Sequence, residues 1–227
     1  MQMEFPAGRN GKIQAVIFDL DGVLMDSEWL AFLAWREVAE AHGARLEDAA
    51  FPGIIGRSDI SSAEYVMEQT GLSLDIEKYV DWTWKRLLEM LAERIEPLPG
   101  AQRLVTSLAG RGLPLAIASN AYTGYIDNAL QGLNLGAHFP VRVGADQVTN
   151  PKPAPDVYLL AAERLGIDPA HCAAIEDSRV GMQAAASAGM RVVAVPDKRS
   201  RSHPFPNAWR VYESLVDVED ELDSVLS

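Results

Sequence analysis

The sequence contains a single cysteine, Cys172, and no excess of basic residues. One cysteine cannot form an intramolecular disulfide, and its place at the start of an apolar run is typical of a small core residue rather than of a nucleophile. Lys and Arg total 20 against 32 Asp and Glu, which gives a net charge of -12. Nucleic acids and anionic membranes are bound through clustered basic side chains, so this composition argues against both classes of partner.

Long hydrophobic runs are also absent. No segment approaches the roughly 18 uninterrupted apolar residues that a membrane helix requires, and residues 1–11 have neither the basic start nor the apolar centre of a signal peptide. Apolar residues nevertheless make up 48% of the chain, which is enough to build a folded core. We therefore expect a cytoplasmic protein without a membrane partner.

Short apolar runs rich in Val, Ile and Ala recur along the chain without alternation, as is typical of strands buried on both faces. These runs are residues 14–20, 115–119, 141–144, 172–176 and 191–195. Helical stretches that end at a glycine lie between them, at residues 101–109, 156–165 and 178–188. This alternation predicts an α/β fold with a Rossmann-like parallel sheet and helices on both faces.

The interval between residues 20 and 115 is far longer than the single crossover helix that a parallel sheet needs. Helical patterns fill it at residues 28–42, 61–70 and 76–94. We interpret residues 28–97 as an inserted α-helical domain, with residues 1–27 and 98–227 forming the α/β core. Its tryptophans are expected to pack the helical bundle: Trp29, Trp35, Trp82 and Trp84. Near the end of the chain, residues 213–223 predict one amphipathic helix.

Acidic side chains follow the first and fourth apolar runs. Asp19 and Asp21 come at the end of the first run and precede Gly22, which can turn sharply, whereas Glu176 and Asp177 end the fourth. Clustered carboxylates are costly unless a cation offsets them, and Mg²⁺ suits a site of few carboxylates plus a substrate phosphate. Taken alone, each pair also fits a simpler interpretation, as solvent-facing acids or as a helix cap.

Polar and basic residues follow the other runs. Ser119 and Asn120 end the second run, where their hydroxyl, amide and backbone N–H groups could hold a phosphoryl oxygen, although such a pair is also common in caps and turns. Lys152 lies between Pro151 and Pro153, which stiffen the loop that presents it; a plain surface lysine is the alternative. All these groups fall at strand carboxyl ends, so together they favour one phosphate-handling site.

As a set these motifs resemble those of the haloacid dehalogenase superfamily, in particular its β-phosphoglucomutase-like phosphatases, which carry a helical cap after the first strand. The resemblance covers nearly the whole chain. It is carried by Asp19-Leu20-Asp21-Gly22-Val23, Ser119-Asn120, Lys152-Pro153, and Glu176-Asp177-Ser178 with Gly181. It implies a Mg²⁺-dependent phosphatase that hydrolyses a small phosphorylated metabolite, first of all a sugar phosphate, through an aspartyl-phosphate.

The resemblance also implies a role for each site residue. Asp19 would be the nucleophile, and Asp21 the general acid and then the base. Mg²⁺ would be held by Asp19, Asp177 and the main-chain carbonyl of Asp21, with Glu176 as a further or water-mediated ligand. Substrate contacts are implied for Gly22, Arg57, Ser119, Asn120 and Lys152, of which Ser119 and Lys152 are also expected to be catalytic.

Two positions bear on the choice among the family's reactions. Asp21 points to phosphate esters, because the family's dehalogenases carry an aromatic residue there and its phosphonate hydrolases a small one. Mutases carry a histidine early in the first cap helix, where gapless counting from Asp19 reaches Ala31. The absence of that histidine argues against a mutase, so a β-phosphoglucomutase-like mutase is kept only as the alternative to a phosphatase.

The role of one cap arginine and the class of the protein each allow more than one interpretation. Arg57, in a Gly56-Arg57-Ser58 stretch that resembles the family's substrate loop, could contact a second anionic group or sugar hydroxyls, or be a surface arginine.

A non-catalytic phospho-ligand binding or regulatory protein is also compatible with the motifs. A phospho-receiver domain fits poorly, because such domains lack an insertion. The sequence leaves open both the ester and the oligomeric state.

Overall fold

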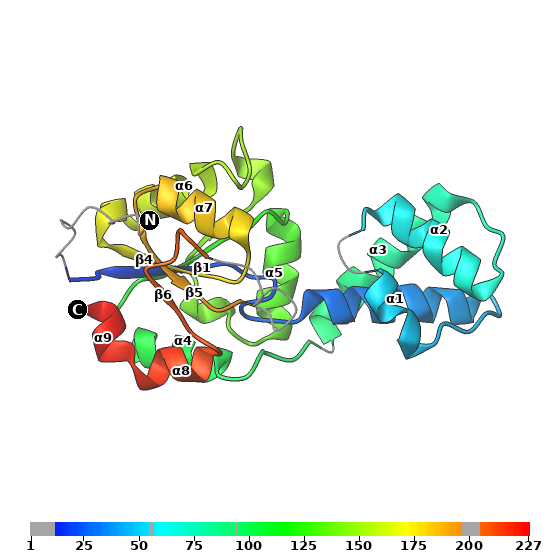
Figure 1. Cartoon of the computed structure of the whole chain (residues 1–227), viewed down its shortest axis with the longest axis horizontal. Helices are drawn as coiled ribbons and strands as arrows, with labels where there is room; N and C mark the ends of the chain where they lie inside the picture. Colours follow the sequence, from blue (N-terminus) through cyan, green and yellow to red (C-terminus); the bar gives the residue numbers. More distant parts are fainter. Residues whose placement is uncertain (1–11, 55–56, 94, 197–204) are drawn as a thin grey trace. The chain divides into compact units, whose positions relative to one another are not determined.

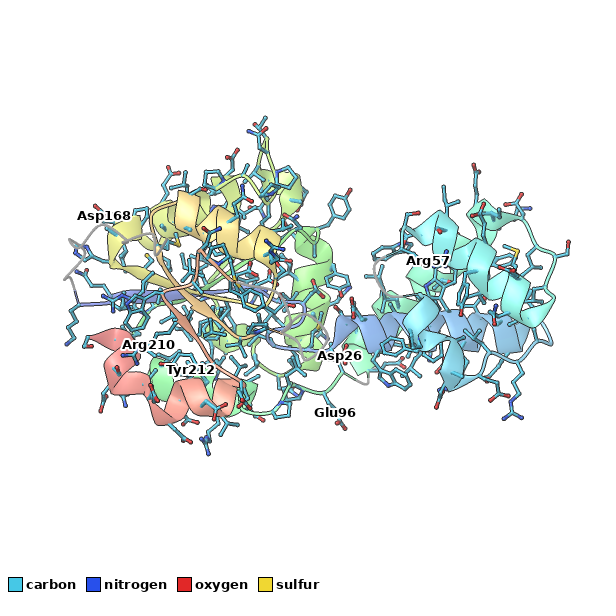
Figure 2. The ribbon with its side chains drawn as sticks, in the orientation of Figure 1. Asp26, Arg57, Glu96, Asp168, Arg210 and Tyr212 are labelled. Carbon is cyan, nitrogen blue, oxygen red and sulfur yellow. The ribbon has the colours of Figure 1, made fainter. Side chains whose placement is uncertain are left out.

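The computed structural model describes residues 12–54, 57–93, 95–196 and 205–227. Residues 1–11, Gly56 and Arg94, which lie in segments interpreted above, fall outside these ranges. The chain divides into two compact units. The described parts of Met1–Met25 and Pro97–Ser227 form the first, and those of Asp26–Glu96 form the second, whose end residues are labelled in Figure 2.

The first unit is built around a 6-stranded sheet in the order β3-β2-β1-β4-β5-β6. The strands are β1 (Ala15–Phe18), β2 (Leu115–Ala118), β3 (Val141–Val143), β4 (Cys172–Glu176), β5 (Arg191–Ala194) and β6 (Arg210–Val211). Neighbouring strands pair in parallel throughout. Every residue of β1, β2 and β4 is buried, as their continuous apolar runs predict. The predicted α/β fold with a Rossmann-like parallel sheet is confirmed.

Helices cover both faces of this sheet (Figure 1), with α6 and α7 on one face and α4 and α8 on the other. The helices of the unit are α4 (Ala101–Gly110), α5 (Thr123–Gly132), α6 (Asp156–Leu165), α7 (Arg179–Ser187), α8 (Leu215–Asp220) and α9 (Leu222–Leu226), with 3-10 turns at Gly136–His138, Ala145–Gln147 and Pro169–His171. Side chains of α6 and α7, including Tyr158 and Met182, pack with Ile17 and Ala118 into one apolar core. The core fixes the strand ends that carry the site.

Two sequence predictions about helix ends are wrong. The helix predicted to stop before Gly110 includes it, and the positive φ of 74° falls at Gly112 instead. The single helix predicted for residues 213–223 is two short helices, α8 and α9. The chain turns at Glu221, whose φ of -104° and ψ of 21° lie outside helical values, and this turn lets the carbonyl of Leu226 accept a hydrogen bond from the N–H of Ile13.

The second unit is a helical bundle made of α1 (Ser27–Ala41), a 3-10 turn at Asp48–Gly53, α2 (Asp59–Thr70) and α3 (Ile76–Glu93). Trp35 is buried in its core, and Trp29 and Trp82 pack against that core, as predicted. Tyr79 is buried in the same core. The prediction for Trp84 is wrong, because this side chain is 40% exposed and its indole N–H donates to Asp59. Among the described residues of the chain, we find no helix with the length and hydrophobicity needed to cross a membrane.

Candidate active site

The carboxyl ends of β1, β2 and β4 bring three of the predicted site residues to one edge of the sheet. Asp19 follows β1, Ser119 follows β2, and Glu176 is the last residue of β4. β1 pairs in parallel with both of its neighbours, so the ends of these strands meet. The backbone N–H of Asp19 also donates to the carbonyl of Ile175 at 2.9 Å, which ties the chain to β4 just past the end of β1.

Lys152 reaches the same edge from the segment between β3 and α6. Its ammonium nitrogen lies 2.6 Å from Asp19 Oδ1 and 2.7 Å from Glu176 Oε1. The three side chains are almost removed from water, with exposed fractions of 4% for Lys152, 10% for Asp19 and 0% for Glu176. Burial opposes the charge on Lys152, but attraction to the two carboxylates outweighs it and raises the pKa of the ammonium. Lys152 is therefore a buried, protonated cation beside Asp19.

Both carboxylate oxygens of Glu176 accept hydrogen bonds from the protein. Oε1 accepts from Lys152 and from the hydroxyl of Tyr158, each at 2.7 Å. Oε2 accepts from the backbone N–H of Ser178 at 3.3 Å and from its hydroxyl at 3.1 Å. A carboxylate offers about four lone-pair sites, so these donors fill them. Gly181 leaves the necessary space, because a Cβ at that position would overlap the carboxylate.

Asp177 completes an acidic group at this edge. Asp19, Glu176 and Asp177 each offer one carboxylate oxygen, and these oxygens all lie within 4.8 Å of one another. Gly22 makes the approach of Asp177 feasible in two ways. Its φ of 76° is a left-handed value that favours glycine, and a Cβ there would overlap the Asp177 carboxylate. The glycine after Asp21 is thus required by the site itself.

The electrostatics of the acidic group favour a bound cation. Burial raises the pKa of Asp19 to about 7, although Lys152 acts in the opposite direction. Burial, with repulsion from Asp19 and Glu176, raises the pKa of Asp177 to about 9. Such shifts mean that the ionised carboxylates lack enough positive charge nearby. Their oxygen atoms are the donors that hard divalent cations prefer, so the residues fit a metal such as Mg²⁺.

Asp21 lies in a tight turn after β1, in which the N–H of Gly22 donates to the carbonyl of Met25 at 2.8 Å. Its Oδ1 accepts a hydrogen bond of 2.9 Å from the hydroxyl of Tyr125 on α5. Sequence reasoning did not identify Tyr125, because no spacing or motif relates it to Asp21. Only the packing of α5 beside this turn brings the hydroxyl to the carboxylate.

Ser119 and Asn120 are brought to the site but make different contacts. Ser119 is buried, and its hydroxyl accepts from the N–H of Ala121 at 3.0 Å. Asn120 uses its side-chain amide to hold the backbone of Lys152: Oδ1 accepts from the Lys152 N–H at 2.8 Å, and Nδ2 donates to the Lys152 carbonyl at 3.2 Å. Asn120 therefore fixes the loop that carries the ammonium, a role that sequence reasoning missed.

Arg57 belongs to the second unit (Figure 2) and is held by its own neighbours there. Its Nε donates to the carbonyl of Gly53, and its Nη1 lies 3.1 Å from the hydroxyl of Ser61. The guanidinium carbon lies 4.8 Å from the centre of the Tyr65 ring. These contacts orient the guanidinium although the side chain is exposed.

A family model described as haloacid dehalogenase-like hydrolase matches residues 16–195. The chain belongs to this family. It is 34% identical over 180 residues to the fructose-1-phosphate phosphatase of Escherichia coli (strain K12), and the match covers 79% of this chain and 95% of that protein. This membership confirms the family that the sequence motifs indicated.

Two other matches of this haloacid dehalogenase-like hydrolase are to proteins with different described activities. The chain is 32% identical over 207 residues to a bifunctional riboflavin kinase/FMN phosphatase of Arabidopsis thaliana, and it spans 54% of that longer protein. A solved Thermotoga maritima structure, provisionally described as a β-phosphoglucomutase, matches with a TM-score of 0.82 and 30% identity over 94% of this chain and 100% of that one.

Proposed function

We propose that this hydrolase is a Mg²⁺-dependent phosphatase that removes the phosphoryl group of a small phosphorylated metabolite. The observation that carries the proposal is the environment of Asp19. Its carboxylate is buried at the end of the central strand, 2.6 Å from a protonated lysine and beside Asp177. A carboxylate with a fixed cation on one side and a candidate metal ligand on the other is suited to attack an anionic phosphoryl group.

In the proposed reaction, a bond forms between an oxygen of Asp19 and phosphorus while the bond from phosphorus to the ester oxygen breaks. Asp21 donates its proton to the leaving alcohol oxygen. In the second step Asp21 takes a proton from water, the water oxygen bonds to phosphorus, and the Asp19–phosphorus bond breaks to release inorganic phosphate. Proton transfer by a positioned side chain typically contributes about a hundred- to ten-thousand-fold in rate.

The remaining site residues bind and orient the phosphoryl group in this proposal. Asp19, Asp177 and the main-chain carbonyl of Asp21 would hold Mg²⁺. Glu176, whose lone-pair sites already accept four protein hydrogen bonds, would hold Lys152 in place rather than contact the metal. Bound Mg²⁺ would supply positive charge that offsets repulsion between the carboxylate and the phosphate.

The phosphoryl oxygens would accept hydrogen bonds from protein donors at the strand ends. The Lys152 ammonium and the hydroxyl of Ser119, which still has its hydrogen to donate, would bind them directly. The backbone N–H of Asn120 is expected to add to this set, whereas the N–H of Gly22 already donates to the carbonyl of Met25. A few placed donors of this kind capture an anion despite the acidic composition of the whole chain.

A sugar phosphate is the substrate class that we favour, because a relative with 34% identity is a fructose-1-phosphate phosphatase. Arg57 is our candidate for contact with sugar hydroxyls or a second anionic group, supported by the contacts that orient its guanidinium.

A sugar-phosphate mutase is the second candidate, favoured by the likeness to the Thermotoga maritima structure. The test is an assay of phosphate release and isomer conversion on a panel of sugar, polyol, acid and nucleotide phosphates. Release that requires Asp19 supports the phosphatase, whereas isomer conversion without release supports the mutase. A panel on which the protein binds esters but transforms none would contradict both and favour a binding protein.

A further inference from the structure

Tyr158 is a completely buried tyrosine that the proposed mechanism does not use. Its hydroxyl donates a hydrogen bond of 2.7 Å to Glu176 Oε1, and the ammonium of Lys152 lies 4.9 Å from the centre of its ring. Burial, with repulsion from Glu176, raises the pKa of this hydroxyl well above its ordinary value, so the group remains a donor. One side chain therefore contacts both members of the buried Lys152–Glu176 ion pair.

The hydroxyl of Tyr158 is not needed to fill the core. A phenylalanine would fill the same space in the core and would keep the ring under the ammonium. The oxygen matters only through Glu176, because a completely buried carboxylate needs a donor for each lone pair. The other three donors to Glu176 come from Lys152 and Ser178.

Two carboxylates compete for the ammonium of Lys152, since Asp19 lies 2.6 Å and Glu176 2.7 Å away. Glu176 Oε1 shares its negative charge between Lys152 and Tyr158. If the tyrosine hydroxyl is removed, that charge acts on Lys152 alone. The ammonium is then drawn toward Glu176 and away from Asp19, where the phosphoryl group has to be transferred.

We propose that Tyr158 is a positioning residue: by donating to Glu176 it holds that carboxylate and limits its pull on Lys152, so that the ammonium stays beside Asp19. The inference rests on the proposed function and deepens it, because it names the group that sets the position of the phosphoryl-binding cation. Preorganised charge of this kind stabilises a transition state more than it stabilises a bound substrate.

The test removes the hydroxyl alone, with Tyr158→Phe, in the full chain with Mg²⁺ present. With p-nitrophenyl phosphate as substrate, we expect kcat to fall about tenfold while KM changes by less than about twofold. Orthovanadate, which imitates the transferring phosphoryl group, is expected to bind about tenfold more weakly by calorimetry. A merely structural hydroxyl would lower the melting temperature but leave both readouts at their wild-type values.

Tyr79→Phe is the matched control. Tyr79 is also completely buried, and its hydroxyl donates to the carbonyl of Trp35 at 3.1 Å, within the core of the second unit. This variant loses one buried phenolic hydrogen bond with no link to the proposed site. It is expected to melt at a lower temperature and to keep kcat within about twofold of the wild type.

A double-mutant cycle tests whether Tyr158 acts through Glu176. In a Glu176→Gln background the anionic pull on Lys152 is absent, so adding Tyr158→Phe is expected to change kcat by less than about twofold. Gly181→Ala would place a Cβ against the same carboxylate and is expected to reproduce the loss in kcat and in orthovanadate binding. That variant also tests the proposal should Tyr158→Phe fail to fold.

The outcomes separate this inference from the proposed function. If Tyr158→Phe leaves both turnover and orthovanadate binding at their wild-type values, the inference about Tyr158 is wrong while the proposed function stands. A full tenfold effect of Tyr158→Phe in the Glu176→Gln background would also overturn only the inference. A wild-type protein that hydrolyses no ester would overturn the proposed function. The orthovanadate comparison still decides the role of Tyr158 in that case.

Discussion

Replacing Lys152 by methionine is expected to destabilise the folded state strongly. The side chain is 4% exposed, and its ammonium contacts Asp19 and Glu176. Methionine keeps most of the volume but leaves two buried carboxylates without their cation. Removing one partner of a buried ion pair costs about 3–5 kcal/mol. For a chain of this size, that corresponds to a fall of about 6–20 °C in melting temperature.

The loss is also expected to depend on pH. A buried carboxyl whose pKa is raised in the folded state binds a proton that the unfolded state has already released, so stability falls as pH rises between the two pKa values. The deficit of Lys152→Met should therefore be larger at pH 8 than at pH 5, where the carboxyls can protonate.

The assay is thermal unfolding of both proteins in excess chelator at the two pH values. Lys85→Met is the control, because Lys85 pairs with Asp81 at the surface, where the two side chains are 68% and 57% exposed. That pair is worth no more than about 1 kcal/mol. A melting temperature for Lys152→Met within about 2 °C of the wild type at pH 8 would refute the reasoning.

Three further predictions concern the acids of the site. Tyr125→Phe removes the hydroxyl that donates to Asp21 Oδ1 and is expected to lower kcat about three- to tenfold with little change in melting temperature; an unchanged kcat would show that the contact is incidental. Gly22→Ala places a methyl group against Asp177 at a positive φ, so Mg²⁺ binding measured by calorimetry should weaken by at least about tenfold, and wild-type affinity would contradict the geometry. The chelated protein should lose stability as pH rises from about 4 toward 9, since burial raises the pKa of Asp19 to about 7 and of Asp177 to about 9. Mg²⁺ should therefore raise the melting temperature more at pH 9 than at pH 6, and an equal increase at both values would contradict the metal site.

The sheet and the meeting of its strand ends were predictable because both follow from local pattern. Buried runs without alternation identify parallel strands, and parallel strands place Asp19, Ser119 and Glu176 at one edge whatever the details of packing. β6 was missed because Arg210–Val211 is too short and too polar to form an apolar run. The break between α8 and α9 was missed because the apolar spacing continues across it.

The contacts that organise the site could not be predicted from sequence. Tyr158 lies on α6, six residues after Lys152, and its sequence position is typical of an ordinary core residue. Only the structure shows that its hydroxyl donates to Glu176. Ser178 also has two contacts that only the structure reveals together: it caps α7 by accepting from Gly181, and it donates to Glu176. Contacts of this kind join residues on different elements, so they depend on how those elements pack. A local sequence pattern does not contain that information.

The central claim is that Asp19 becomes covalently phosphorylated. The most direct measurement is an acid quench of the wild-type protein during turnover of a ³²P-labelled sugar phosphate with Mg²⁺ present, followed by mapping of the labelled peptide. We expect label on the peptide that contains Asp19, and neither label nor turnover in Asp19→Asn. Turnover by the wild type with label on another residue, or hydrolysis that persists in Asp19→Asn, would contradict the claim.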